Sequence, residues 1–152
     1  MTALPAWLTR VQSDSMAPAL RDGQLVLTIP PRRKHRFRRG AVVAVDSREV
    51  GRRIVKRIIG LPGDHLRLEG NHVWVNGHLL DEPYASAATY RGTFDVPAGH
   101  YVLLGDNRDA SSDSRSWRHP YVSRLEIAGV LIRLLPTRLR RSSSPHRPAG
   151  AL

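Results

Sequence analysis

Short apolar runs separated by turn residues fill most of the chain. Runs of this kind are typical of β-strands, and the Gly, Pro, Asn and Asp residues between them are typical of turns that join antiparallel strands. The expected strands cover residues 24–29, 41–45, 54–59, 65–69, 73–75, 100–104 and 127–135. Since no helical pattern and no repeat accompanies them, we predict an all-β domain of packed antiparallel sheets, partly closed and barrel-like.

The ends of the chain differ in composition from its middle. A chain of 152 residues is long enough to bury one core. We therefore expect an N-terminal extension at 1–10, one folded domain at 11–135, and a basic tail at 136–152 whose Arg, Ser, Pro and Ala content predicts disorder. The apolar patch at 4–8 is expected to contact the fold rather than a membrane. No window approaches the roughly 18 to 20 apolar residues that span a bilayer.

Arginine carries almost all of the positive charge. The formal net charge is +11, and the chain has 22 arginines but only two lysines, Lys34 and Lys56. This charge is compatible with an anionic partner such as nucleic acid or an acidic membrane surface. Lys34 lies in the basic run 31–39, which we expect to be an exposed loop. Lys56 lies in a β-branched run, where a lysine among arginines requires its own explanation.

Metal and redox chemistry find little support in the sequence. The chain has no cysteine, and its seven histidines lack the spacing that places two ligands on one metal ion. We therefore expect neither a metal nor another cofactor.

Ser15 and Lys56 are a candidate nucleophile and base. A serine hydroxyl is a weak nucleophile unless a neighbouring group takes its proton, and lysine can do so once burial makes its amine neutral. Arginine stays charged and cannot replace lysine in this role. Pro18 stiffens the loop of Ser15, so the hydroxyl can be both exposed and held. The alternatives are an ordinary loop serine and a strand lysine with its amine in solvent.

A third stretch, 101–115, is an apolar strand that leads into a polar turn. The residues of the turn include Gly105, Asp106, Asn107, Ser111, Ser112, Asp113, Ser114 and Arg115. Many hydrogen-bonding groups at the end of a strand suit the wall of a site. The alternative is a surface turn in which Asp113 and Arg115 form a local ion pair.

Together the three stretches resemble the type I signal peptidase family, the serine-lysine endopeptidases that remove signal peptides. Residues 13–20 are similar to the nucleophile motif of that family, 53–64 to the segment that carries the base, and 105–115 to its third motif. Their order and spacing match as well, and the resemblance covers residues 11–133. It implies the β fold that signal peptidases share with self-cleaving repressors.

The resemblance also implies a role for each matched residue. Ser15 would be the nucleophile, Lys56 the general base, and Ser111 the group that orients the lysine amine. The Ser13 hydroxyl and the Ser15 backbone N–H would form the oxyanion hole, and Met16 would help line the site. The remaining supporting residues are Asp106, Asn107, Asp113 and Arg115.

The substrate implied by the resemblance is a precursor protein or signal peptide, bound as an extended strand with small residues one and three before the cut. Peripheral membrane contact is compatible with it, and no specific nucleic acid is expected. Typical members carry transmembrane helices before the serine, whereas 14 residues precede Ser15 here. We expect either a soluble or peripherally bound specialist or an anchor outside this chain. Small anchorless relatives that are thought to mature nickel-type superoxide dismutase precursors are similarly short.

Two positions depart from the pattern of the family. Asp14 stands where glycine is usual, and an acidic group so close to Lys56 would hold the amine in its charged form and slow acylation. Ala19 stands where threonine commonly follows the proline, which removes a hydroxyl. The sequence therefore predicts the catalytic pair with an altered neighbourhood.

Three other functions are alternatives. A self-cleaving repressor would share the Ser-Lys pair, but it should carry a cleavable Ala-Gly or Cys-Gly site and a DNA-binding domain ahead of the serine. A non-catalytic basic domain would bind nucleic acid or an anionic membrane through 32–39 and 138–141, with affinity that falls steeply with salt. Only Phe37 is interleaved with these basic residues, which weakens base stacking. An inactive peptidase is the third alternative, and the intact catalytic residues argue against it.

Overall fold

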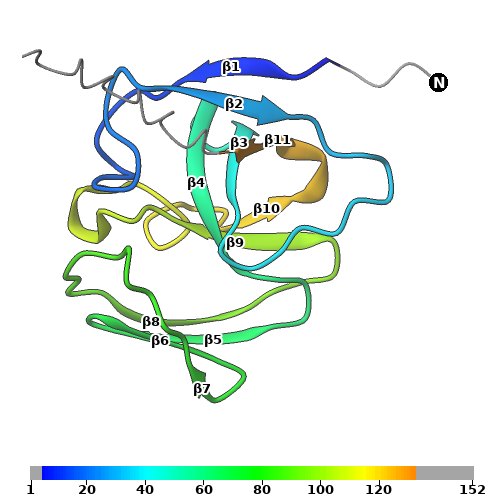
Figure 1. The fold of residues 1–152 in the computed structure, drawn as a ribbon. Helices are drawn as coiled ribbons and strands as arrows, with labels where there is room; N and C mark the ends of the chain where they lie inside the picture. The colour runs from blue at the N-terminus through cyan, green and yellow to red at the C-terminus, as the bar shows by residue number, and fades with distance from the viewer. Residues whose placement is uncertain (1–4, 133–152) are drawn as a thin grey trace, which may run out of the picture.

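The computed structural model of the protein describes residues 5–132, which form two antiparallel β-sheets (Figure 1). The strands are β1 (Trp7–Arg10), β2 (Leu25–Ile29), β3 (Val42–Ser47), β4 (Arg52–Gly60), β5 (His65–Glu69), β6 (His72–Val75), β7 (His78–Leu79), β8 (Arg91–Asp95), β9 (His100–Leu104), β10 (Tyr121–Ser123) and β11 (Ile127–Ile132). The larger sheet has the order β1-β2-β11-β3-β4-β9-β10, and the smaller sheet has the order β7-β6-β5-β8. Single-turn 3-10 helices, η1 (Arg108–Ala110) and η2 (Arg124–Glu126), lie in two connections.

The longest strand, β4, has one free edge over half of its length. It pairs with β3 from Arg52 to Arg57, but with β9 only from Arg57 to Gly60. On the side away from β3, the backbone groups of Arg52 to Lys56 therefore have no strand partner among residues 5–132. An unpaired strand edge presents N–H and C=O groups that can bind another extended chain.

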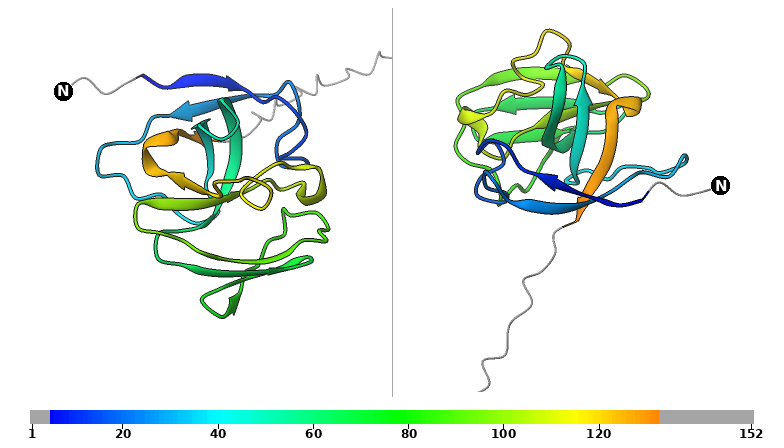
Figure 2. Two further views of the ribbon diagram at one scale, coloured as in Figure 1. Left: turned by 180° about the vertical axis from the view of Figure 1, so that it is seen from behind. Right: turned by 90° about the horizontal axis from the view of Figure 1, so that it is seen from above.

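The two sheets pack against each other through an apolar core, and Figure 2 shows the smaller sheet stacked across β9 of the larger one. The buried residues of this core are Ile59, Leu66, Leu68, Val73, Val75, Phe94, Val96, Val102 and Leu104. Gly60 permits the close approach, because a Cβ atom there would lie 2.8 Å from Leu66 Cδ1 and 2.9 Å from Val102 Cβ. The core fixes β4 and β9 relative to each other, and both strands lead to the functional site.

β1 forms one edge of the larger sheet, within the segment for which the sequence predicts an extension. Trp7 to Arg10 pair with β2, and the hydroxyls of Thr9 and Thr28 are hydrogen-bonded at 2.6 Å. The apolar patch near the N-terminus thus contacts the fold. Its sequence is too short and mixed to be recognised as a strand, because an edge strand draws its stability from the neighbour that it pairs with.

The outer face of β1, β2 and β11 carries exposed aliphatic side chains. Leu8 is 59% exposed, Leu25 is 52%, Ile29 is 40% and Ile132 is 41%. Leu25 and Ile29 share a face because side chains alternate along a strand, and Leu8 and Ile132 lie opposite Leu27 of that same face. We call these four residues, with Leu27, the outer apolar face.

The prediction of an all-β domain of packed antiparallel sheets is confirmed, although neither sheet closes on itself within residues 5–132. All seven expected strands have counterparts, and the last is described as far as Ile132. Strands β1, β7, β8 and β10 were not expected, because their sequences lack an apolar run.

The predicted tail at 136–152 lies outside the described residues. Within them, no helix has the length and apolar character needed to cross a membrane.

Candidate active site

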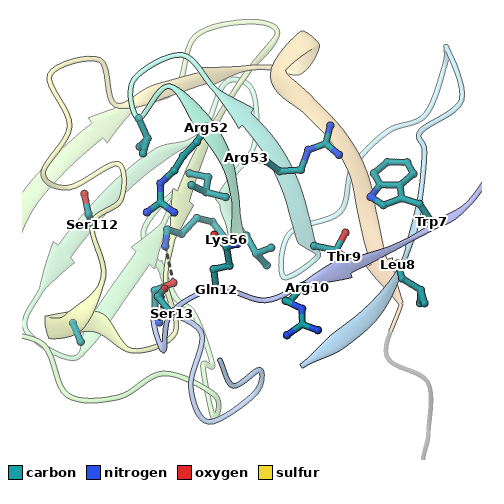
Figure 3. Close-up of a pocket in the computed structure, with 15 residues that line it drawn as sticks. Trp7, Leu8, Thr9, Arg10, Gln12, Ser13, Arg52, Arg53, Lys56 and Ser112 are labelled. Atoms are coloured by element: carbon teal, nitrogen blue, oxygen red, sulfur yellow. Dashed lines mark hydrogen bonds between the residues drawn. The ribbon is translucent and has the colours of Figure 1, made fainter. Parts of the chain in front are cut away.

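Ser15 and Lys56 meet where the loop between β1 and β2 lies against β4. Ser15 lies in the loop that connects β1 to β2, and Lys56 lies on β4. The Lys56 Nζ donates a hydrogen bond to the Ser15 Oγ at 2.8 Å, marked by the dashed line in Figure 3. Both residues are buried, with exposed fractions of 9% for Ser15 and 5% for Lys56. The structure therefore brings together a hydroxyl and an amine that are 41 residues apart in the sequence.

Burial lowers the pKa of Lys56 to about 8, because the charged amine is desolvated in this position. The carboxylates of Asp113 and Asp106 act in the opposite direction, while the cations Arg52 and Arg115 lower the pKa further. The net result is an amine that becomes neutral at mildly alkaline pH. A neutral amine 2.8 Å from a hydroxyl can accept its proton.

The loop of Ser15 is held by Asn107 from the turn after β9. The Asn107 backbone N–H donates to the Ser15 carbonyl at 3.0 Å, and its side-chain Nδ2 donates to the Asp14 carbonyl at 3.1 Å. Met16 packs into a core cluster with Val11 and Leu20, and it is not among the residues that line the cavity described below. Met16 therefore anchors the loop that carries Ser15.

Ser13 adopts a backbone conformation that is unusual for a residue with a side chain. Its φ is 81°, in the left-handed region, and its N–H donates to Asp22 Oδ1 at 2.7 Å. The Ser15 N–H points to the Ser13 Oγ at 3.5 Å. The two groups predicted to form an oxyanion hole therefore lie next to each other, and their joint action on a substrate stays a prediction.

Asp14, which the sequence predicts to hold the Lys56 amine in its charged form, lies in the same loop as Ser15. Its Oδ1 accepts a hydrogen bond from the Asp22 backbone N–H at 3.2 Å. The largest charge effects on the Lys56 amine come from Asp113 and Arg52. The exposed carboxylate of Asp14 is thus engaged within its own loop.

Gly105 gives Ser111 room beside the loop of Ser15. A Cβ at Gly105 would lie 2.1 Å from the Ser111 Oγ and 2.6 Å from the Ser15 carbonyl oxygen, so no larger residue fits without movement. The Ser111 Oγ is buried and has no hydrogen-bond partner among the described residues. A hydrogen bond from Ser111 to the Lys56 amine stays a prediction.

Buried ion pairs fix the turn that carries these groups. Asp113 is fully buried, and its carboxylate accepts from the Gly105 N–H at 2.9 Å and from the Arg115 Nε at 2.8 Å. The predicted local pair of Asp113 and Arg115 therefore forms as part of a buried network. A fully buried carboxylate keeps its charge only when it is paired and hydrogen-bonded in this way.

Arg57 is a structural residue of the site that the sequence does not indicate. Its guanidinium contacts both carboxylate oxygens of the fully buried Asp106, at 2.8 and 2.6 Å. Glu82 forms a similar pair with Arg108, on the next part of the turn. No local signal predicts either pair, since the partners are 49 and 26 residues apart in the chain.

A cavity of about 720 Å³ opens beside Ser15 and Lys56. It runs along the free edge of β4 toward β1, as Figure 3 shows. Its wall includes Ser13, Gln12 and the segment 52–56, with Ala110 and Ser112 on another side. In the described part of the chain, no cluster of three or more His, Asp and Glu side chains could hold a metal ion. We call this cavity the groove.

Comparison with known proteins agrees with this arrangement. The fold is that of a peptidase: a crystal structure of a signal peptidase I from Enterococcus faecalis V583 matches with a TM-score of 0.58 and 31% identity, covering 64% of this chain and 98% of that one. The model of the family described as signal peptidase, peptidase S26, matches residues 3–134. The chain therefore belongs to the signal peptidase family.

Curated relatives carry the same family name. Signal peptidase I U of Bacillus subtilis (strain 168) is 35% identical over 118 residues, which are 70% of this chain and 63% of the relative. Signal peptidase I of Bacillus licheniformis is 37% identical over 119 residues, which are 70% of this chain and 64% of the relative. The chain thus spans a little under two thirds of the length of these two proteins.

Proposed function

We propose that the protein is a serine endopeptidase of the signal peptidase type, which cleaves signal peptides or N-terminal propeptides after small residues. Ser15 is the nucleophile and Lys56 the general base. The observation that carries the proposal is the 2.8 Å contact between the Lys56 amine and the Ser15 hydroxyl, in a place where burial lowers the pKa of Lys56 to about 8. Family membership supports the same reaction class.

In the proposed reaction, neutral Lys56 takes the proton of the Ser15 hydroxyl while the Oγ attacks the carbonyl carbon of the scissile bond. The negative charge that develops on the carbonyl oxygen is stabilised by the Ser15 N–H and the Ser13 hydroxyl. Protonated Lys56 then gives its proton to the departing amine, which leaves an ester on Ser15. Attack by water on the ester, with Lys56 again as the base, restores the enzyme and releases the acid product.

The free edge of β4 supports binding of the substrate as an extended strand. In the described part of the chain, the backbone groups of Arg52 to Lys56 have no strand partner on that side, and these five residues line the cavity. A substrate strand that pairs with this edge is led directly to the Ser15 hydroxyl. The preference for small residues one and three before the cut is carried over from the family.

The test uses a fluorogenic peptide with alanine one and three residues before the cut, together with a mechanism-based serine acylating inhibitor. At pH 9, wild type should cleave the peptide between the expected residues and gain one inhibitor mass on Ser15, as mapped by peptide mass spectrometry. Ser15→Ala should do neither, whereas Thr93→Ala, which removes an exposed hydroxyl on β8 of the smaller sheet, should behave as wild type. Folded wild type that neither cuts nor gains mass would instead favour a binding protein or an inactive peptidase.

The dependence of activity on pH should follow the lowered pKa of Lys56. Only the neutral amine can act as base, so kcat/KM should rise about tenfold per pH unit below pH 8 and level off above it. Initial rates with the alanine peptide from pH 6 to 10 would show this limb. A flat profile, or a limb near the ordinary lysine value of 10.5, would contradict the proposed base.

Ser13→Gly should separate catalysis from stability. Glycine adopts a positive φ freely, so the variant should be more stable than Ser13→Ala, which keeps the strained conformation. Both variants lose the hydroxyl of the oxyanion hole, and kcat should fall by about 100-fold in each. Urea unfolding and steady-state kinetics on the two variants make the comparison. Equal stability of both, or unchanged kcat in either, would contradict one half of this account.

We further propose peripheral contact of the outer apolar face with anionic lipid. The face exposes Leu8 and Leu25 at more than half of their surface, and the exposed cations Arg32 and Arg33 follow closely after β2. Apolar side chains beside basic groups match the chemistry of an anionic membrane surface.

Leu8→Asp/Leu25→Asp should weaken sedimentation with phosphatidylglycerol vesicles at least about tenfold, because two aliphatic side chains are lost from the contact. Leu79→Asp is the matched control, since Leu79 is 58% exposed on β7 of the other sheet. Equal weakening by both variants would show a general effect of charge, and no binding by wild type would remove the proposal.

A further inference from the structure

The groove beside Ser15 and Lys56 has a strongly asymmetric charge. Three arginines and one lysine are among the residues that line it, and no aspartate or glutamate is. The cations are Arg10, Arg52, Arg53 and Lys56. An extended chain bound in this groove therefore meets positive groups and no negative side chain.

Most arginines near the site are already paired with a carboxylate. Arg53 binds Asp46 through two contacts of 2.7 and 2.8 Å, and its guanidinium also lies 5.4 Å from the ring centre of Trp7. Arg57 and Arg115 are paired with buried aspartates. These charges are neutralised within the protein and are not available to a substrate.

Arg52 differs from them. No carboxylate of residues 5–132 lies within ion-pair distance of its guanidinium, and the segments 1–4 and 133–152 contain no aspartate or glutamate. Figure 3 shows its side chain directed into the cavity toward Lys56. Its charge is among those that lower the pKa of the Lys56 amine, which agrees with this direction. Arg52 is thus an unpaired cation beside the reacting groups.

We propose that Arg52 selects substrates that carry an acidic side chain close to the scissile bond. This inference rests on the proposed peptidase function and adds to it a charge requirement. A planar guanidinium binds a carboxylate through two parallel hydrogen bonds, and such pairs are stronger than contacts between neutral groups. A basic side chain at the same substrate position is repelled.

The strand geometry limits where the acidic residue stands. Arg52 is four residues before Lys56 on β4, so the two side chains lie on the same face of the strand. The Arg52 side chain is directed toward Lys56 (Figure 3), so its guanidinium lies closer to Lys56 than four residues of strand would place it. The carboxylate should therefore be about two to four residues from the scissile bond of a substrate that pairs with β4.

The experiment is a scan of one charge along a neutral peptide. The parent peptide has alanine one and three before the cut, and each variant places a single Asp, its neutral isostere Asn, or a Lys at one position around the cut. We expect wild type to favour Asp over Asn at one or two neighbouring positions, by about fivefold in kcat/KM. Arg52→Gln should abolish that preference, and Arg52→Glu should favour Lys over Asp at the same position. Arg91→Gln, which removes an arginine whose side chain is 78% exposed on the smaller sheet, should keep the wild-type preference.

Two outcomes would overturn the inference: Asp no better than Asn at every position, or a preference that survives Arg52→Gln. Failure of the peptidase function itself is seen separately, as absence of cleavage of the neutral parent peptide. In that case, fluorescence anisotropy with Ser15→Ala protein and labelled peptides tests the charge requirement by binding alone. Tighter binding of the Asp peptide that Arg52→Gln removes would support the inference, and equal binding of Asp and Asn peptides would overturn it.

Discussion

Lys56→Met is expected to abolish cleavage and at the same time to stabilise the protein at neutral pH. Without a base, the Ser15 hydroxyl keeps its proton, and kcat/KM for the alanine peptide should fall at least about 10⁴-fold. Methionine fills a similar volume without a charge, so the packing around the buried position is kept. The burial that lets Lys56 act as a base also lowers the free energy of unfolding, because the charged amine is desolvated in the folded protein.

The sign of the stability effect follows from proton linkage. The pKa of Lys56 is lowered from 10.5 to about 8 in the folded protein, so between these pH values the unfolded chain binds more protons. The free energy of unfolding of wild type therefore rises with pH through this window, and below pH 8 the buried amine must be charged at a cost. Lys56→Met lacks that cost and should be more stable at pH 6 by on the order of 3 kcal/mol. The difference should shrink toward zero as pH approaches 10.5.

Urea unfolding at pH 6, 8 and 9.5 measures this difference. Lys34→Met is the matched control, because Lys34 is exposed and is the other lysine of the chain. Its activity in the peptide assay should equal that of wild type at each pH, and the difference in stability between it and wild type should not change with pH. A Lys56→Met protein that is less stable than wild type at pH 6, or that keeps more than a tenth of its activity, would contradict the assignment of the base.

Gly105→Ala is expected to produce the second large effect. A Cβ at this position would lie 2.1 Å from the Ser111 Oγ and 2.6 Å from the Ser15 carbonyl oxygen. The methyl group must push the Ser15 loop and Ser111 apart, which displaces the hydroxyl from the Lys56 amine. A shift of about 1 Å in a reacting group can cost about 100-fold in rate, and we expect kcat/KM to fall by at least that factor. Overpacking should also lower the free energy of unfolding by about 1 to 3 kcal/mol.

Gly129→Ala is the matched control for this effect. Its Cβ would lie 2.6 Å from Thr28 Cγ2 and 2.9 Å from the Ile29 carbonyl oxygen, so it is also overpacked, but between β11 and β2. The two variants should lose similar stability, measured by thermal unfolding, while Gly129→Ala keeps nearly the full activity of its folded fraction. Equal loss of activity in both would show that Gly105 acts through stability alone.

Some elements were predictable because they depend on local pattern. Apolar and polar residues alternate in 65–69, and 100–104 is a nearly continuous apolar run. Turn residues flank both segments, and both form strands where the sequence indicates. β1 and β8 were not predictable. Their residues are polar or mixed, and they are strands because β2 and β5 offer them backbone partners.

The sequence also indicated some residues of the candidate site and missed others. The resemblance of three motifs indicated Ser15, Lys56 and the turn after β9, since those residues are read directly from the chain. The pairing of Arg57 with Asp106 and the direction of Arg52 into the groove were not indicated, because both depend on segments that are distant in the sequence. The same holds for the Asp14 carboxylate, which accepts a hydrogen bond from the Asp22 backbone N–H.

The sequence by itself determined the all-β class, the position of most strands and the residues that can supply a nucleophile and a base. The class and the strands follow from short-range periodicity and turn chemistry. The candidate nucleophile and base follow from the resemblance of three motifs to those of signal peptidases, and Lys56 is also the one strand lysine in an arginine-rich chain. The tertiary structure alone decided that the lysine is buried, that its amine lies 2.8 Å from the hydroxyl, and that the edge of β4 is left open beside them. Desolvation and strand pairing depend on the packing of segments far apart in the chain, and local sequence does not specify them.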